Sequence, residues 1–99
     1  MIDLLVATND RQMVKQRIHV AIYSYTLPEG IEDITMLDGM VKQALIHYND
    51  FDLTKITWIS GQIIMKFGRH TSTPTYPNAF TLTYDGEPIN FIFMERFHV

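Results

Sequence analysis

The sequence predicts an α+β domain in which one amphipathic helix packs on a mainly antiparallel sheet of four to six strands. One stretch carries apolar residues at helical spacing, whereas most other apolar residues lie in short runs rich in β-branched and aromatic side chains. Glycine-containing turn sequences separate several of these runs. The expected order is strand, strand, helix, strand, an optional strand, strand and strand, within a single domain of residues 1–99.

The first two strands are expected at residues 2–7 and 13–26. In the second, every other residue from Ile18 to Ile22 is β-branched, as one face of a strand requires. Apolar residues from Val14 to Tyr25 also recur at helical spacing, so a helix is the alternative. We prefer the strand because the segment contains neither Leu nor Glu, which helices favour.

The helix is expected after a break at residues 27–30, which read Leu-Pro-Glu-Gly. Its apolar residues recur at steps of three and four, which places them on one face. They are Ile34, Leu37, Val41, Ala44 and Tyr48. Asn49 suits the position just past the end of the helix.

The second half of the chain contains two pairs of β-rich runs. Residues 54–59 and 62–67 are separated by Ser and Gly, which indicates either a hairpin or one long strand with a bulge at Gly61. Residues 80–84 and 89–97 flank an Asp-Gly turn sequence and predict a second hairpin.

The last strand is apolar on both faces. Strand alternation places Phe91 and Phe93 on one side and Ile92 and Met94 on the other. Because a single helix covers only one face of a sheet, we expect these four residues to include an interface with another molecule. A homodimer is the simplest cover, and a loop of the same chain is the alternative.

Composition excludes several classes of protein. The 99 residues carry 8 basic and 11 acidic side chains, a net charge of −3, which disfavours a nucleic-acid partner. The absence of cysteine excludes a disulfide scaffold, a cysteine-ligated metal centre and a cysteine nucleophile. No apolar run approaches the roughly 20 residues that cross a membrane. The first residues include Asp3 and lack the basic start of a secretory signal, so we expect a cytoplasmic location.

One long polar stretch, residues 68–79, is expected to be a loop and a contact region for a partner. Its alternative is a loosely packed connector. The candidate partner-binding residues in and beside it are Lys66, Arg69, His70, Thr71, Ser72 and Tyr76. His70 and Ser72 lack the carboxylate and oxyanion hole of a hydrolase site, and the four histidines are not at metal-ligand spacing. No catalytic, metal or cofactor site is therefore expected.

The leading hypothesis is a non-enzymatic protein-binding module of the inhibitor or regulatory type. A phage or mobile-element accessory protein acting on a host protein or nucleoprotein complex is one example. A second hypothesis is a nucleic-acid-binding module that uses residues 66–76 and the aromatic side chains of the sheet. A third is a small enzyme whose site lies between two subunits, where His70 meets residues of a second chain.

Overall fold

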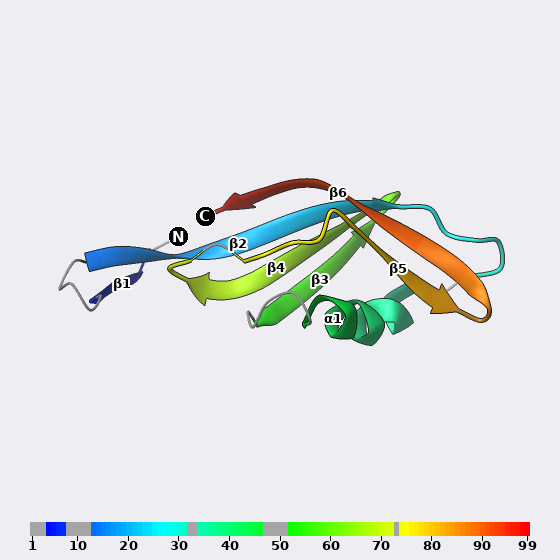
Figure 1. The fold of residues 1–99 in the computed structure, drawn as a ribbon, viewed down its shortest axis with the longest axis horizontal. Coiled ribbons are helices and arrows are strands. Elements are labelled where there is room, and N and C mark those ends of the chain that lie inside the picture. Colours follow the sequence, from blue (N-terminus) through cyan, green and yellow to red (C-terminus); the bar gives the residue numbers. More distant parts are fainter. Residues whose placement is uncertain (1–3, 8–12, 32–33, 47–51, 73) are drawn as a thin grey trace.

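A computed structural model describes residues 4–7, 13–31, 34–46, 52–72 and 74–99, with side chains described from residue 16 onwards. Its elements in chain order are β1 (Leu4–Ala7), β2 (Met13–Tyr25), a 3₁₀ turn η1 (Ile34–Leu37), α1 (Asp38–Ile46), β3 (Leu53–Ile59), β4 (Gln62–His70), β5 (Ala79–Tyr84) and β6 (Glu87–His98). The helix α1 packs against one face of an antiparallel sheet (Figure 1), which confirms the predicted α+β class.

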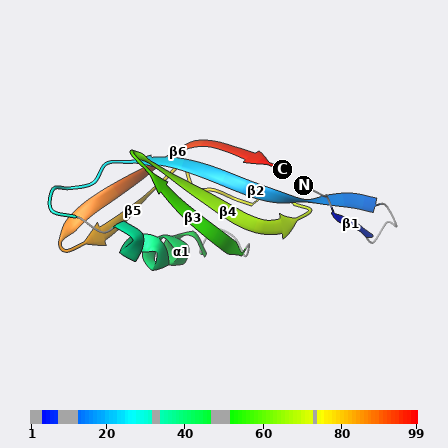
Figure 2. The same cartoon turned by 180° about the vertical axis from the view of Figure 1, so that it is seen from behind.

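The described strands form one sheet with β2 at its centre. The strand order is β3-β4-β2-β6-β5, and β1 pairs with the N-terminal part of β2 (Figure 2). All pairings are antiparallel. The molecule is elongated, with extents of 53 × 25 × 20 Å. Among the described residues, no helix has the length and apolar character needed to cross a bilayer.

Residues 13–25 form the central strand rather than a helix. Ala21 and Tyr23 are fully buried on the face toward α1, and Val20, on the opposite face, is also buried. Ile22 and Ser24 on the outer face are only partly buried, so burial along β2 is deepest on the face that α1 covers.

Both predicted hairpins are present. The turn between β3 and β4 contains Gly61 at φ +78°, a left-handed conformation that favours glycine, so the hairpin reading is confirmed over the single bulged strand. The turn between β5 and β6 places Asp85 at φ +53° and Gly86 at φ +78°. Two successive positive φ values are typical of a type I′ hairpin turn.

The core lies between α1 and the face of the sheet toward it, which we call the inner face. From the helical segment, Leu37, Val41 and Leu45 are buried in it. The sheet contributes aromatic side chains, including Phe80 and Phe91, whose rings stack with centroids 4.6 Å apart. Ile34 and Ala44 pack at its edge, and so confirm the predicted apolar helix face. Tyr48 and Asn49 lie outside the described residues.

The prediction that a loop begins at residue 68 is wrong, because β4 continues to His70. Lys66, Arg69 and His70 therefore belong to a strand. The backbone N–H of Gly68 donates to the carbonyl of Asp52 over 2.8 Å, which extends the contact between β4 and the chain entering β3. Gly68 therefore lies within the strand.

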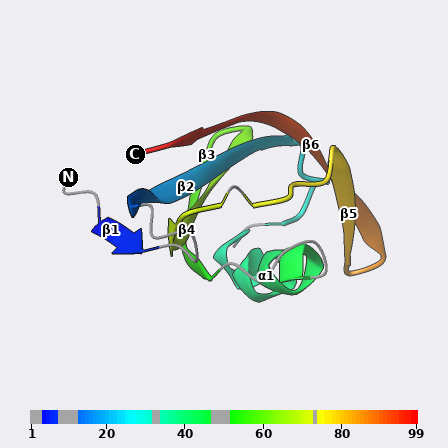
Figure 3. The same ribbon diagram turned by 60° about the vertical axis from the view of Figure 1, so that its left-hand side comes forward.

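Residues 74–78 run across the inner face of the sheet as a cover (Figure 3). Pro74 is fully buried. The Tyr23 hydroxyl donates to the carbonyl of Pro77, and the Phe93 N–H donates to the carbonyl of Asn78 over 2.8 Å. These bonds make the segment part of the packed structure rather than a loose connector.

Candidate functional site

The face of the sheet opposite α1, which we call the outer face, is left open by the other described elements (Figure 3). Its apolar side chains include Ile59, Ile92, Met94 and Phe97, which are 49%, 52%, 50% and 46% exposed. Of the predicted interface residues, the structure thus places Ile92 and Met94 on this face. It places Phe91 and Phe93 on the inner face, where Phe91 is fully buried and Phe93 packs against Tyr23.

The register of the strands joins these side chains into one surface. Ile22 of β2 lies opposite Ile64 of β4, and directly opposed residues of an antiparallel pair share a face. The Gln62 amide donates to the sulfur of Met94 over 3.4 Å, which holds Met94 on the same side. We call the resulting surface the outer-face patch. It consists of Ile22, Ile59, Ile64, Ile92, Met94 and Phe97.

Two lysines border the outer-face patch. Lys55 of β3 lies directly opposite Lys66 of β4, and Val20 and Phe97 continue the same row across the sheet. Like charges that face each other across two strands destabilise the pairing. On the same face, Glu95 lies opposite Ile22. The patch is therefore apolar with one carboxylate, that of Glu95, among its side chains, and it is basic at one border.

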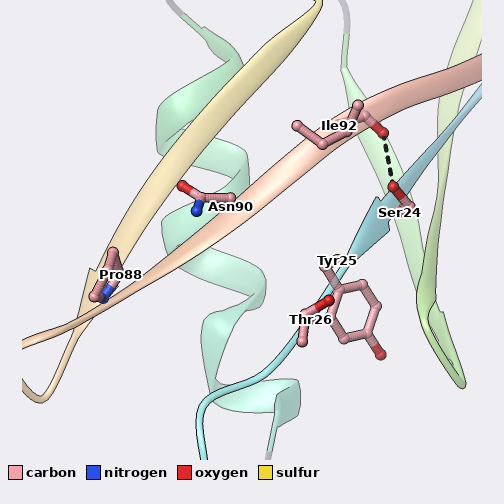
Figure 4. A pocket seen from close by; sticks show the side chains of 6 residues that line it. All are labelled: Ser24, Tyr25, Thr26, Pro88, Asn90 and Ile92. Atoms are coloured by element: carbon pink, nitrogen blue, oxygen red, sulfur yellow. Dashed lines mark hydrogen bonds between the residues drawn. The ribbon is translucent and has the colours of Figure 1, made fainter.

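A shallow pocket of about 210 Å³ opens beside Ile92, where β6 leaves β2 (Figure 4). Its lining consists of Ser24, Tyr25, Thr26, Pro88, Asn90 and Ile92. The Ser24 hydroxyl donates to the carbonyl of Ile92 over 3.5 Å, and Thr81 donates to the Asn90 side chain over 2.8 Å. The side chains of Ser24 and Asn90 are thus engaged by neighbouring strands, and the pocket hollows the surface beside the patch.

Basic side chains gather on the inner face, at the end of the sheet where β4 and β6 finish. His19 lies opposite His98, and Arg17 lies opposite His70. Arg96 lies opposite the inward-facing Ala21 and so shares this face. This end of the molecule is basic although the whole chain carries a net charge of −3.

A pocket of about 440 Å³ lies among these residues, and we call it the basic pocket. It is lined by His19, Tyr76, Arg96, Phe97 and His98, so it also borders the outer-face patch at Phe97. Burial lowers the pKa of His19 below its ordinary value of 6.5. The backbone carbonyl of His70 lies 3.4 Å from Nε2, and this hydrogen bond raises the pKa of His19. The side chains of His98, His70 and Arg17 lower it further. His19 is therefore neutral at physiological pH.

Tyr76 closes one side of the basic pocket. Its ring packs against Phe67 and Phe93, with centroids 5.7 and 6.0 Å away. Its hydroxyl oxygen is buried and has no hydrogen-bond partner among the described residues. Burial raises the pKa of Tyr76 to about 12, and the charge of Arg96 acts in the opposite direction.

The predicted partner-binding residues do not form one surface. Lys66 lies on the outer face, whereas Tyr76 lies on the inner face beside the basic pocket. Thr71 and Ser72 are exposed in the bend after β4. The Nη1 atom of Arg69 is buried without a hydrogen-bond partner among the described residues.

Sequence reasoning missed the cluster of His19, Arg96 and His98. A signal was present, because basic residues two positions apart share one face of a strand. Arg17 with His19, and Arg96 with His98, follow this spacing on two strands. Only the pairing of β2 with β6 brings them together. In the described part of the chain, no group of three or more His, Asp or Glu residues is placed to hold a metal ion.

Comparison with known proteins gives no match. The sequence matches no protein-family model and no curated protein, and the structure matches no solved structure.

Proposed function

We propose that this chain is a non-enzymatic protein-binding module of the inhibitor or regulatory type, and that the outer-face patch is its contact surface. The observation that carries the proposal is the half-exposed state of Ile92, Met94 and Phe97 on the open face of the sheet. Single exposed apolar residues are ordinary on protein surfaces, but a contiguous set on one face is typical of an interaction site.

The occupant that suits this surface best is a second copy of the chain. The lysine pair Lys55 and Lys66 borders the patch on one side, and the β5–β6 turn with Asp85 and Glu87 lies toward the other end of β6. A two-fold axis through the patch brings the basic end of one copy toward the acidic end of the other. Two sheets packed face to face in this way form a self-complementary interface.

Light scattering of the purified chain from micromolar to millimolar concentration tests this proposal. We expect a dimer, and we expect Ile92→Asp to convert it to a monomer by placing a charge in the apolar contact. Gln43→Asp adds the same charge at an exposed position of α1, on the other side of the sheet, and should leave the dimer intact. A wild-type chain that is monomeric throughout, or a dimer insensitive to Ile92→Asp, overturns the proposal.

A further inference from the structure

We propose that β5 binds an extended segment of another protein, which joins the sheet as a further strand and places side chains in a groove between β5 and the helical segment 34–46. The site consists of the side of β5 away from β6, which we call the β5 edge, and this groove. Neither part contains a residue of the outer-face patch, so the proposal does not depend on the dimer.

The β5 edge presents unpaired backbone groups. β5 is the last strand in the sheet and has a neighbouring strand on one side only (Figure 3). The N–H of Phe93 donates to the carbonyl of Asn78, and hydrogen-bonded pairs alternate along an antiparallel ladder, so the even-numbered residues of β5 are the ones bonded to β6. The backbone N–H and C=O groups that point to the β5 edge are therefore those of Ala79, Thr81 and Thr83. Among the described residues, no backbone group pairs with them.

The β5 edge also lacks the features that usually keep edge strands from pairing with other chains, which are lysines, prolines and bulges. The opposite edge strand, β3, has two of these features, because it carries Lys55 and its pairing with β4 shifts register between Leu53 and Lys55. β5 reads Ala-Phe-Thr-Leu-Thr-Tyr, without charge or proline, and its register with β6 is unbroken. An uncharged, regular edge of this kind is a template for strand addition.

A shallow apolar groove of about 520 Å³ lies beside the β5 edge on the inner face. Its lining consists of Met36, Gly39, Met40, Gln43, Ala44 and Leu82. A strand added to β5 directs every second side chain to the inner face, and the residue opposite Leu82 enters this groove. Backbone pairing then supplies affinity, and the groove selects an apolar side chain at alternate positions of the segment.

A second copy of the chain suits the β5 edge less well than a different protein. In a pairing of two β5 strands, the side chains offered to the groove are Phe80 and Leu82 of the other copy. Both are buried in their own core, where the Phe80 ring stacks on Phe91 with centroids 4.6 Å apart. They are therefore not free to fill a groove on another molecule, whereas an extended segment of a different protein brings side chains without such contacts.

The charge at the end of β5 gives the segment a direction. Asp85 follows β5 directly and is exposed, and residues 77–84 of a second copy carry no basic side chain to place beside it. In an antiparallel segment, a Lys or Arg at the N-terminal end lies next to Asp85. We therefore expect a segment that begins with a basic residue and continues with alternating apolar and polar residues.

Nuclear magnetic resonance titration with the capped peptide Lys-Leu-Thr-Leu-Thr-Val-Thr tests the proposal. With Lys beside Asp85, the second Leu of the peptide lies opposite Leu82. We expect saturable binding and slower amide hydrogen exchange at Thr81 and Thr83, because their N–H groups gain an acceptor. The Leu82 amide faces β6 and should change little, so it serves as an internal control.

Two matched comparisons separate strand addition from general apolar attraction. N-methylation of the first two threonines of the peptide removes N–H groups that face β5 and should abolish binding, whereas N-methylation of the two leucines, whose N–H groups face away, should not. In the protein, Met36→Asp should weaken binding by about tenfold or more by placing a charge in the groove. Ile46→Asp places the same charge on the helical segment outside the groove and serves as the control, since Met36 and Ile46 are 53% and 54% exposed.

Three results overturn the assignment. The first is the absence of saturable binding by the peptide. The second is equal loss of binding for the two methylated peptides, or for Met36→Asp and Ile46→Asp. The third is protection of the Thr81 and Thr83 amides that rises with protein concentration in the absence of peptide, because a second copy of the chain then occupies the β5 edge.

Discussion

The indole nitrogen of Trp58 donates a 2.6 Å hydrogen bond to Oδ1 of Asp38. Trp58 lies on edge strand β3 and Asp38 is the first residue of α1, so the bond joins the helix to the border of the sheet. The Trp58 ring also meets Tyr25 edge to face, with centroids 5.2 Å apart. This contact therefore fixes where α1 begins relative to the inner face.

Replacement of Trp58 by Phe should lower the free energy of unfolding by about 1–3 kcal/mol, because it removes a hydrogen bond to a carboxylate. Urea denaturation followed by circular dichroism measures the change. Asp38→Asn keeps an oxygen acceptor and should cost less. Equal stability of Trp58→Phe and the wild type would show that the bond contributes nothing.

Neighbouring residues of β6 should respond very differently to truncation. Phe91 is fully buried on the inner face, so Phe91→Ala should lower the free energy of unfolding by about 3–5 kcal/mol. Ile92 is 52% exposed, and Ile92→Ala should cost about 1 kcal/mol or less when measured at a protein concentration low enough to separate the proposed dimer. Chemical denaturation of both variants checks the expectation, which fails if the two costs are similar.

Two glycines should give opposite signs when changed to alanine. Gly61 has φ +78°, so Gly61→Ala should destabilise the chain by about 1–2 kcal/mol through backbone strain. Gly39 lies in α1 with open space at the position of a Cβ, so Gly39→Ala should stabilise it by about 0.5–1 kcal/mol. Thermal unfolding measures the two effects, as a lower midpoint for Gly61→Ala and a higher midpoint for Gly39→Ala. Midpoints that shift in the same direction for both variants would contradict the expectation.

The lowered pKa of His19 predicts a loss of stability toward acid. In the unfolded chain His19 takes up a proton near pH 6.5, whereas in the folded chain it does so only at lower pH. The free energy of unfolding therefore falls as the pH drops from 6.5 toward the lowered pKa of the folded state. Besides burial, the basic side chains of His98, His70 and Arg17 lower the pKa of His19. Urea denaturation above and below pH 6.5 should show a smaller pH dependence for His19→Gln than for the wild type. An unchanged dependence would show that His19 does not cause the loss of stability.

Removal of the Tyr76 hydroxyl should raise stability. The oxygen is buried and unpaired within the described structure, and an unsatisfied buried polar group costs about 1–3 kcal/mol. Tyr76→Phe keeps the ring between Phe67 and Phe93 and should therefore raise the midpoint of thermal unfolding. A lower midpoint would mean that the hydroxyl already has a partner in solution.

Local sequence features predicted the elements of the fold well. Gly61 and the Asp85-Gly86 pair set the two hairpins, because few other residues adopt positive φ. The β-branched and aromatic composition of residues 13–25 distinguished strand from helix. These signals act between neighbours in the chain and need no knowledge of distant partners.

The strand order and both candidate sites depend on distant pairings that no local pattern encodes. His19 and His98 meet only because β6 returns to the central strand. The extension of β4 past Gly68 depends on a bond to Asp52 and was missed for the same reason. Alternation along β6 predicted that Ile92 faces away from Phe91, but not which side α1 would cover.

The position of β2 has a consequence for synthesis on the ribosome. Ser24 and Ile92 are neighbours across two strands although 68 residues separate them in sequence. The nascent chain therefore carries an apolar strand with one unsatisfied edge until β6 has left the exit tunnel. Chaperones that shield extended apolar segments should engage this interval of translation, and chains stalled before Phe91 should aggregate rather than fold.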